Sequence, residues 1–186
     1  MNTNICLSDD LISLRPPQPK DISAIHTAVR ESLAELYPWV DWATDAYDEA
    51  STQRWMEIVL LAWEHSSGFQ FAITDAASGE YIGGCGLDGI DQKNHSCNLS
   101  YWVRTSRTGQ GIASRAARLI ARFAFETIGL LRAEIVIAAG NIASQHVAQK
   151  VGAHYEDTLP DHLVVHSTVY DAAIFSLTPK DFDMPG

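Results

Sequence analysis

The stretch that decides the fold runs from Tyr101 to Phe125 and reads YWVRTSRTGQGIASRAARLIARFAF. It begins as an apolar, strand-like run, continues through a loop that contains Gly109 and Gly111, and ends with a wide apolar stripe at helical spacing. Where a turn meets the N-terminus of a helix, unpaired backbone N–H groups and the helix dipole together favour an anion. Glycine has no Cβ, so the backbone can approach a ligand closely there. The stretch therefore predicts a strand, a loop able to hold a diphosphate, and a helix.

Several kinds of loop share such glycines. A Walker loop requires Gly-Lys-Ser/Thr after the glycines, and that sequence does not follow here. A dinucleotide fingerprint requires Gly or Ala at the sixth position counted from Gly109, where this chain has Ser114. A plain strand-to-helix turn without any ligand is also compatible with the residues. Arg104 and Arg107, beside the glycines, are expected to add positive charge at the edge of a phosphate site.

Length and composition narrow the class of protein. The chain has 186 residues, which suits a single domain spanning residues 1–186. It has no long uncharged apolar run, and its first residues lack a basic start followed by an apolar segment, so we expect a cytoplasmic protein without a membrane span. A formal net charge of −10 disfavours nucleic acid and suits a cationic partner such as an amine or a basic peptide, although the acidity can also serve solubility alone.

The three cysteines predict no cross-link. Cys6, Cys85 and Cys97 are odd in number and widely spaced, which indicates neither a disulfide framework nor a zinc site. We expect them to be reduced, buried thiols.

Periodicity places the other elements around the central stretch. It predicts a short strand and a helix within 11–36, a helix from about 48 to 65 and a hairpin starting at 69. It also predicts strands at 97–103 and 133–139, a short helix at 141–151, and two final strands after 153. The fold class is α+β with a mixed sheet, in which the connection through the glycine loop is the one clear parallel crossover.

The motifs together resemble one family. YWVR and GQGIAS are followed by the buried-type strand AEIVIAA and then by GNIASQHVAQKVGA, which ends at residue 153. This combination resembles the GNAT superfamily of N-acetyltransferases, and within it the Rim-type enzymes that acetylate N-terminal amines of ribosomal proteins. Weaker matches at LRPPQPKDISAI, YPWVDWA and YDAAIFSLTPKDF extend the likeness over the whole chain. The resemblance implies the GNAT fold, a mostly antiparallel sheet with one splayed pair of parallel strands, flanked by helices.

The resemblance also implies acetyl-coenzyme A as the acetyl donor, bound without a metal. Its expected binding residues are Trp102, Val103, Arg104, Arg107, Gly109, Gln110, Gly111, Ile112, Ala113, Ser114 and Asn141. Tyr101 would line the same arm, and Arg115 is a candidate contact for the 3′-phosphate. Asn141 also suits the N-cap of the helix that follows it.

Two residues are implied to act in the chemistry. Ser144 would protonate the leaving thiolate, because Ala148 stands where many relatives carry a tyrosine. Asn98, together with Ser100, stands near the position of the glutamate base of many relatives; neither accepts a proton well at neutral pH, and either would position a water instead. The base itself stays open, with candidates at Glu35, Asp41, Asp88, His162 and His166.

Tyr37, Trp39 and Trp42 are expected to wall the acceptor pocket, with core packing as their alternative role. The acceptor would be a peptide N-terminal amine or a small amine, and the protein a monomer or homodimer. A non-catalytic module that binds acyl-coenzyme A is the alternative function, since Asn98 and Ala148 both depart from the common pattern. A hydrolase is disfavoured, because the chain has no Gly-x-Ser-x-Gly elbow.

Overall fold

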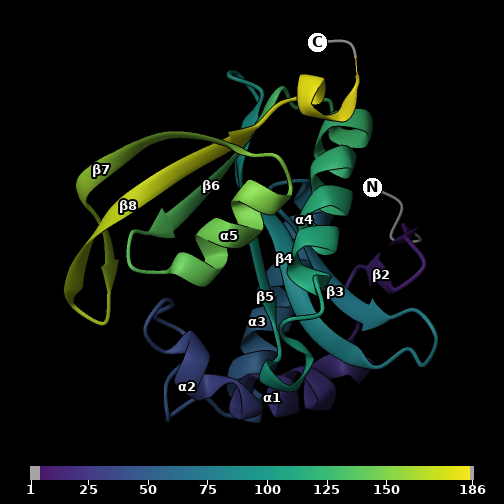
Figure 1. Cartoon of the computed structure of the whole chain (residues 1–186). Helices are drawn as coiled ribbons and strands as arrows, with labels where there is room; N and C mark the ends of the chain where they lie inside the picture. The colour runs from purple at the N-terminus through teal and green to yellow at the C-terminus, as the bar shows by residue number, and fades with distance from the viewer. Residues whose placement is uncertain (1–4, 185–186) are drawn as a thin grey trace.

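A computed structural model describes residues 5–184 of the chain. Its strands form one eight-stranded sheet in the order β1-β2-β3-β4-β5-β6-β8-β7 (Figure 1). The strands are β1 (Leu7–Ser8), β2 (Ile12–Arg15), β3 (Phe69–Asp75), β4 (Tyr81–Asp91), β5 (Ser96–Val103), β6 (Arg132–Ala138), β7 (His154–Val165) and β8 (Thr168–Leu177). Among them β5 and β6 are the parallel pair, and the remaining neighbours are antiparallel. This confirms the expected α+β fold with a mostly antiparallel sheet.

Helices cover both faces of the sheet. They are α1 (Ile22–Glu31), α2 (Leu33–Leu36), α3 (Glu49–His65), α4 (Ile112–Phe123) and α5 (Ile142–Lys150). In Figure 1, α4 and α5 lie in front of the sheet, whereas α1 and α3 lie behind it. None of the helices within residues 5–184 combines the length and the apolar content that a membrane crossing requires.

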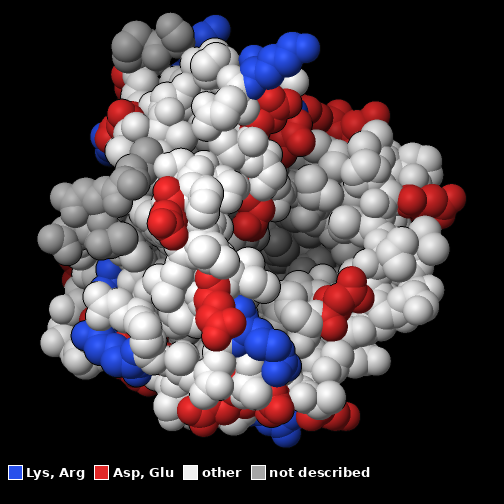
Figure 2. All heavy atoms as spheres, turned by 180° about the vertical axis from the view of Figure 1, so that it is seen from behind, with Lys and Arg blue, Asp and Glu red and all other residues white. Residues whose placement is uncertain are grey.

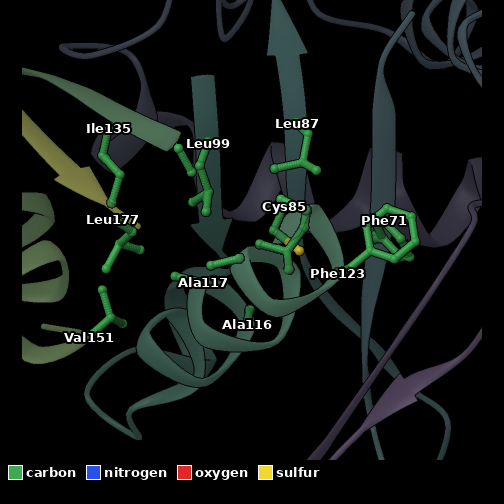
Figure 3. Close-up of a cluster of buried hydrophobic side chains, with 14 of the residues drawn as sticks. Phe71, Cys85, Leu87, Leu99, Ala116, Ala117, Phe123, Ile135, Val151 and Leu177 are labelled. Atoms are coloured by element: carbon green, nitrogen blue, oxygen red, sulfur yellow. The ribbon is translucent and has the colours of Figure 1, made fainter. Parts of the chain in front are cut away.

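The main core lies between α4 and the sheet (Figure 3). Alternate residues of β4 and β5, such as Cys85, Leu87 and Leu99, point toward the helix and are buried. Helix α4 packs against these residues with an apolar stripe that includes Ala116 and Phe123, both almost fully buried. The small alanine lets the helix approach the strands closely, so the glycine loop before α4 is held at a fixed place above the sheet.

Helix α3 differs from the expected stripe at one position. The apolar spacing of α3 predicts Ile58 on the buried side together with Val59 and Trp63, but Ile58 is 65% exposed. The buried stripe includes Met56 instead, which fills the space against α1 and β3. Val59 and Trp63 are buried as expected, so the helix keeps its predicted face toward the sheet and only Ile58 lies outside it.

The cysteines also differ from expectation in part. Cys85 and Cys97 are buried and free, as expected, but Cys6 is exposed. Cys6 precedes the short edge strand β1, which the sequence did not predict, and lies outside the packed layers. Burial raises the pKa of Cys97 to about 12, with smaller contributions from the negative charges of Asp88 and Glu134.

The last two strands form a long hairpin that extends beyond the rest of the sheet (Figure 1). Its turn is made by His166 and Ser167, whose φ angles are 46° and 67°. This left-handed conformation is the one that two-residue hairpin turns require, and glycine or asparagine usually supplies it. Two residues of other types in this conformation indicate that contacts around the turn hold it in place.

Candidate active site

The sheet opens between its two parallel strands. Pairing of β5 with β6 is confined to Ser96–Asn98 against Arg132–Glu134, and Leu99–Val103 pair with β4 alone. The amide of Arg104 donates to a carbonyl of β4 over 3.0 Å. Because backbone groups along a strand alternate in direction, Tyr101 and Val103 must direct their N–H and C=O groups into the gap. The gap is therefore edged by free backbone groups able to pair with an extended ligand.

The glycine loop lies at the open end of this gap. Gly109 and Gly111 have φ angles of 74° and 76°, in the region that favours glycine. Gly111 is the N-cap of α4 without any side-chain cap, and the first intrahelical bond runs from the amide of Arg115 to the carbonyl of Gly111. The amides of Ile112, Ala113 and Ser114 precede that bond and lack an intrahelical partner. Gly109, Gln110 and these first residues of α4 thus form a turn whose geometry suits an anion, and the binding itself stays a prediction.

Basic side chains surround a hollow beside the loop. The hollow is lined by Gln110, Gly111, Ser114, Arg115, Arg118, Lys150 and Val151. The side chain of Arg115, however, is paired with Asp9 at 2.8 Å and with Asp10 at 2.6 Å. Lys150 was not singled out from the sequence, since it lies on α5, and only the fold brings it beside Gly111.

The two arginines before the glycines are engaged elsewhere. Arg104 forms ion pairs with Glu31 and Glu80, and Arg107 pairs with Asp75 at 2.6 Å and with Glu80 at 2.8 Å. Their positive charges are therefore already matched by carboxylates of α1 and of the β3–β4 turn. Both side chains brace the start of the loop against the rest of the fold.

Carboxylates of α1 and α2 fix the same loop through its polar groups. Glu31 accepts from the amide of Ser106 at 2.8 Å, and Glu35 accepts from the hydroxyl of Thr105 at 2.9 Å. Hydrogen bonds from Arg104 and then from Ser106 lower the pKa of Glu31 to about 2, so it is ionised throughout the neutral range. Glu35, a candidate base from the sequence, is thus placed at the loop rather than in the gap.

Helix α5 brings a polar group to the other side of the gap. Asn141 caps the helix, its Oδ1 accepting from the amide of Ser144 at 3.1 Å. The hydroxyl of Ser144 donates to Oη of Tyr101 at 3.2 Å, and Tyr101 donates to the carbonyl of Ser144 at 2.9 Å. Burial raises the pKa of Tyr101 to about 12, so this phenol stays neutral at working pH. Ala148, on the same helix, is fully buried. The sequence contained no signal for the pairing of Tyr101 with Ser144.

A group of polar side chains lies on the opposite face, where the gap begins. Asn98 is the last residue of β5 paired on both sides, with Asp88 on β4 and with Glu134 on β6. Within residues 5–184, its Oδ1 is the buried side-chain atom that has no hydrogen-bond partner. Ser100, the next residue on this face, donates to Oδ2 of Asp88 at 3.3 Å. Three oxygen-bearing side chains thus gather on one face at the base of the gap.

Aromatic residues form the rim on this side. Tyr37 stacks on His166 in the turn between β7 and β8, with ring centroids 4.2 Å apart. Trp39 lies against Tyr170, and Trp42 lies edge-on to Trp102 of β5 at 6.1 Å. Tyr37 and Trp39 thus contact the β7–β8 hairpin, whereas Trp42 contacts β5, and their role as pocket walls stays a prediction.

Figure 2, which views the molecule from behind, shows a deep hollow with Asp and Glu side chains around it. Two candidate bases, Asp41 and His166, contact each other where the β7–β8 turn meets the loop after α2. The amide of His166 donates to Oδ1 of Asp41 at 2.5 Å. His162 is exposed on β7. Of the five candidates, Asp88 is the one on the face of the sheet where the gap begins.

Comparison with known proteins agrees with these features. A model of the acetyltransferase (GNAT) domain matches residues 12–154. The Bacillus subtilis (strain 168) protein YdaF, provisionally named a ribosomal N-acetyltransferase, is 25% identical over 182 residues, covering 96% of this chain and 97% of YdaF.

Two solved structures have closely similar folds. The ribosomal-protein-S5-alanine acetyltransferase of Vibrio fischeri superposes with a TM-score of 0.85 at 18% identity, covering 94% of this chain and 97% of that one. The microcin C7 self-immunity acetyltransferase MccE, solved with acetyl-CoA and AMP, has a TM-score of 0.86 at 18% identity over 91% and 93% of the two chains. At such identities these likenesses show a shared fold.

Proposed function

Because this chain belongs to the acetyltransferase (GNAT) domain family, we propose that it transfers an acetyl group from acetyl-coenzyme A to the primary amine at the N-terminus of a peptide or protein. One observation carries the proposal: the parallel strands β5 and β6 part beyond Asn98, directly beside a glycine turn at the N-terminus of α4. The turn suits a diphosphate and the gap suits an extended amide-bearing arm. The two together fit the two parts of coenzyme A.

The donor site in this proposal is built mainly from backbone groups. Amides between Gly109 and Ser114 hold the diphosphate, since they are unpaired and the helix dipole favours an anion there. The gap-facing groups of Tyr101 and Val103 pair with the pantetheine amides, as an added strand would. Asn141 keeps its Nδ2 free for the same arm while Oδ1 caps α5.

Arg104 and Arg107 contribute by bracing the loop in this proposal, because their guanidinium groups are already paired with carboxylates. Trp102 contributes its backbone to the strand, whereas its indole packs against Trp42 on the acceptor side. The domain is taken as residues 1–186, of which residues 1–4 and 185–186 lie outside those the structure describes. A cytoplasmic location is part of the proposal.

The chain's own groups divide the chemistry between the two sides of the gap. The amine attacks the thioester carbonyl, and a backbone N–H of β5 that faces the gap and is not paired with the pantetheine arm stabilises negative charge that develops on the carbonyl oxygen. Ser144 supplies a proton to the departing sulfur, which needs little help because a thiol has a pKa of about 8.5. Asn98 accepts a hydrogen bond from the incoming amine through its unpartnered Oδ1.

The acceptor enters from the side of the aromatic rim. The hollow seen in Figure 2 is bordered by acidic side chains, which favours a positively charged amine. The provisional name of YdaF and the name of the Vibrio fischeri enzyme both refer to ribosomal proteins, which supports a protein N-terminus as acceptor. A non-catalytic acyl-coenzyme A-binding module receives no support from the comparisons.

A thiol-release assay tests the proposal. Acetyl-coenzyme A is offered with synthetic peptides that carry a free N-terminal alanine or serine, with the same peptides acetylated at that amine, and with small amines such as spermidine. We expect release that depends on the free peptide amine, together with a mass increase of the peptide by one acetyl group. Tight binding of coenzyme A without release across all amines would contradict the proposal.

A further inference from the structure

The amine site contains a carboxylate that the family resemblance does not place there. The position where many relatives carry a glutamate base is occupied by Asn98 and Ser100, which are poor proton acceptors. Asp88 lies directly across from Asn98 on the neighbouring strand β4. Directly opposed residues of an antiparallel pair have their Cβ atoms about 4.5–5.5 Å apart. A carboxylate therefore stands one strand away from the usual position, on the same face of the sheet.

The surroundings of Asp88 hold this carboxylate in one orientation. Gln70 on β3 donates to Oδ1 of Asp88 at 2.7 Å. Its amide can lie there because Gly86 has no side chain, since a Cβ on Gly86 would come within 2.2 Å of the amide atoms of Gln70. Regular pairing of β4 ends just after Asp88, in an irregularity that includes Gly89 with φ at 57°. Such bulges commonly aim side chains at active sites.

The second carboxylate oxygen of Asp88 is connected to the gap by the hydroxyl group of Ser100. Oδ2 of Asp88 accepts from Oγ of Ser100 at 3.3 Å, which leaves the lone pairs of Oγ free to accept. The unpartnered Oδ1 of Asn98 lies on the same face. An ammonium group donates three hydrogen bonds and needs acceptors of this kind. Glu134, the other carboxylate beside Asn98, is instead paired with Arg132 at 2.9 Å.

From this arrangement we infer that Asp88 takes up the proton that the acceptor ammonium must lose, with Ser100 as the relay. The ammonium gives one proton to Oγ of Ser100 while Ser100 passes its own proton to Oδ2 of Asp88, so that the amine becomes neutral and Ser100 is unchanged. The neutral amine forms its bond to the carbonyl carbon as the carbon–sulfur bond breaks. Its second proton goes to the thiolate by way of Ser144, and Asp88 returns its proton to water. This inference rests on the proposed function.

The test compares the pH dependence of kcat/KM for a free-amine peptide in wild type, Asp88→Asn and Ser100→Ala. Removing a proton acceptor lowers the rate by about 100-fold at pH 6.5. A peptide α-amine has a pKa near 8, so above about pH 9 the amine arrives neutral and the deficit shrinks at least about tenfold. A purely structural defect would lower the rate equally at all pH values. Calorimetry with coenzyme A and the thermal midpoint check that donor binding and folding are kept.

Two further variants sharpen the assignment. Because Ser100 and Asp88 act in one path, their effects should not add. We expect kcat/KM of the double variant Asp88→Asn/Ser100→Ala to lie within about twofold of that of the slower single variant. Moving the carboxylate back, in Asp88→Asn/Asn98→Asp, is expected to restore part of the low-pH rate. Glu134→Gln, the matched control, should keep the wild-type profile.

The outcomes separate this inference from the function itself. A wild-type enzyme that acetylates the peptide while Asp88→Asn keeps the same pH profile would overturn the role of Asp88 and leave the function intact. The same conclusion follows if Glu134→Gln, rather than Asp88→Asn, shows the deficit at low pH. A wild type that releases no thiol with any amine would refute the proposed function, and this inference with it.

Discussion

The hydroxyl groups of Tyr101 and Ser144 meet across the gap in the sheet: Tyr101 donates to the carbonyl of Ser144 at 2.9 Å and accepts from its hydroxyl at 3.2 Å. Tyr101 belongs to β5 and Ser144 to α5, so this pair connects the strand at the edge of the gap with the helix that carries the proposed acid. The buried phenol stays neutral, because the pKa of Tyr101 is raised to about 12. It can therefore orient Ser144 over the whole working range of pH.

Removal of Ser144's hydroxyl tests its role as proton donor. We expect Ser144→Ala to lower kcat by roughly 10- to 100-fold, at or below the lower end of the range of about 100- to 10,000-fold for a lost acid, because a thiolate is already a good leaving group. The dissociation constant of coenzyme A, measured by calorimetry, should change less than about threefold.

Tyr101→Phe is the companion variant. It keeps the ring but frees the hydroxyl of Ser144, so a smaller loss of kcat is expected, together with a loss of stability of about 1 kcal/mol for the missing hydrogen bond. Unchanged turnover in Ser144→Ala would remove this residue from the mechanism.

Glycine at the N-terminus of α4 is predicted to be needed for donor binding. Gly111→Ala places a Cβ in space that is open apart from Nζ of Lys150 at 3.6 Å, so the damage comes from the backbone, which has φ at 76°. Left-handed geometry costs a non-glycine residue about 1–2 kcal/mol, and relief of that strain would shift the amides that face the diphosphate. Calorimetry should show weaker coenzyme A binding by tenfold or more.

Gly129 offers the matched control for this variant. It also has positive φ, at 81°, and a Cβ there meets nothing within 4 Å. Gly129→Ala should lose similar stability, since the backbone strain is alike, while it keeps the affinity for coenzyme A. Equal affinity loss in both variants would mean that strain alone, and not the position of the amides, weakens binding.

Part of this architecture could be predicted from the sequence, because the residues that determine it are neighbours in the chain. The stripe of α4 and the glycines before it are contiguous, so periodicity and turn chemistry were sufficient to identify strand, loop and helix. The contact of Gln70 with Asp88 crosses from β3 to β4, and that of Tyr37 with His166 joins residues 129 positions apart. Their register depends on how the strands pair, which alternation within each strand does not reveal.

One signal for the proposed amine site is nevertheless present in the sequence. The run of small residues from Gly83 to Gly86 is unusual within a strand, and glycine in a strand commonly marks a place where another group approaches closely. In the structure Gln70 crosses Gly86, and a Cβ on Gly84 would come within 2.9 Å of the indole nitrogen of Trp102. Arg104 shows the opposite case, because its partners Glu31 and Glu80 could not be foreseen from its place beside the glycines.

The bracing of the loop by Glu31 predicts a dependence of stability on pH. The folded-state pKa of Glu31 is about 2, lowered chiefly by Arg104, whereas an unfolded glutamate has a pKa of about 4.3. A lowered pKa stabilises the fold above the unfolded value, and this contribution is lost as the pH falls toward the folded value. The difference in thermal midpoint between wild type and Glu31→Gln should therefore be constant near neutral pH and shrink between about pH 5 and pH 2.

Glu126→Gln is the control for that experiment. Glu126 pairs with Arg122 within one helical segment, and the two side chains are 49% and 52% exposed. Exposed pairs of this kind contribute little, so the midpoint should change by no more than a degree or two at any pH. A midpoint difference for Glu31→Gln that persists unchanged at pH 2 would show that its ionisation does not support the loop.

The contact of the hairpin turn with the aromatic rim is predicted to govern acceptor binding. His166 stacks on Tyr37, its Nε2 lies 3.0 Å from the carbonyl oxygen of Tyr37, and its amide donates to Asp41. His166→Ala removes the stack and frees the hairpin from the α2 loop, so the walls of the acceptor hollow lose their fixed spacing. We expect KM for a free-amine peptide to rise roughly five- to tenfold, about 1–1.4 kcal/mol, because the peptide must then order the rim as it binds.

Ser167→Gly is the matched variant, since it relieves φ at 67° while it leaves the contacts of His166 in place, and it should keep KM and match or raise the thermal midpoint. Steady-state kinetics and calorimetry decide between the outcomes: an unchanged KM in His166→Ala, or an equal loss of coenzyme A affinity, would mean that the hairpin does not shape the acceptor site.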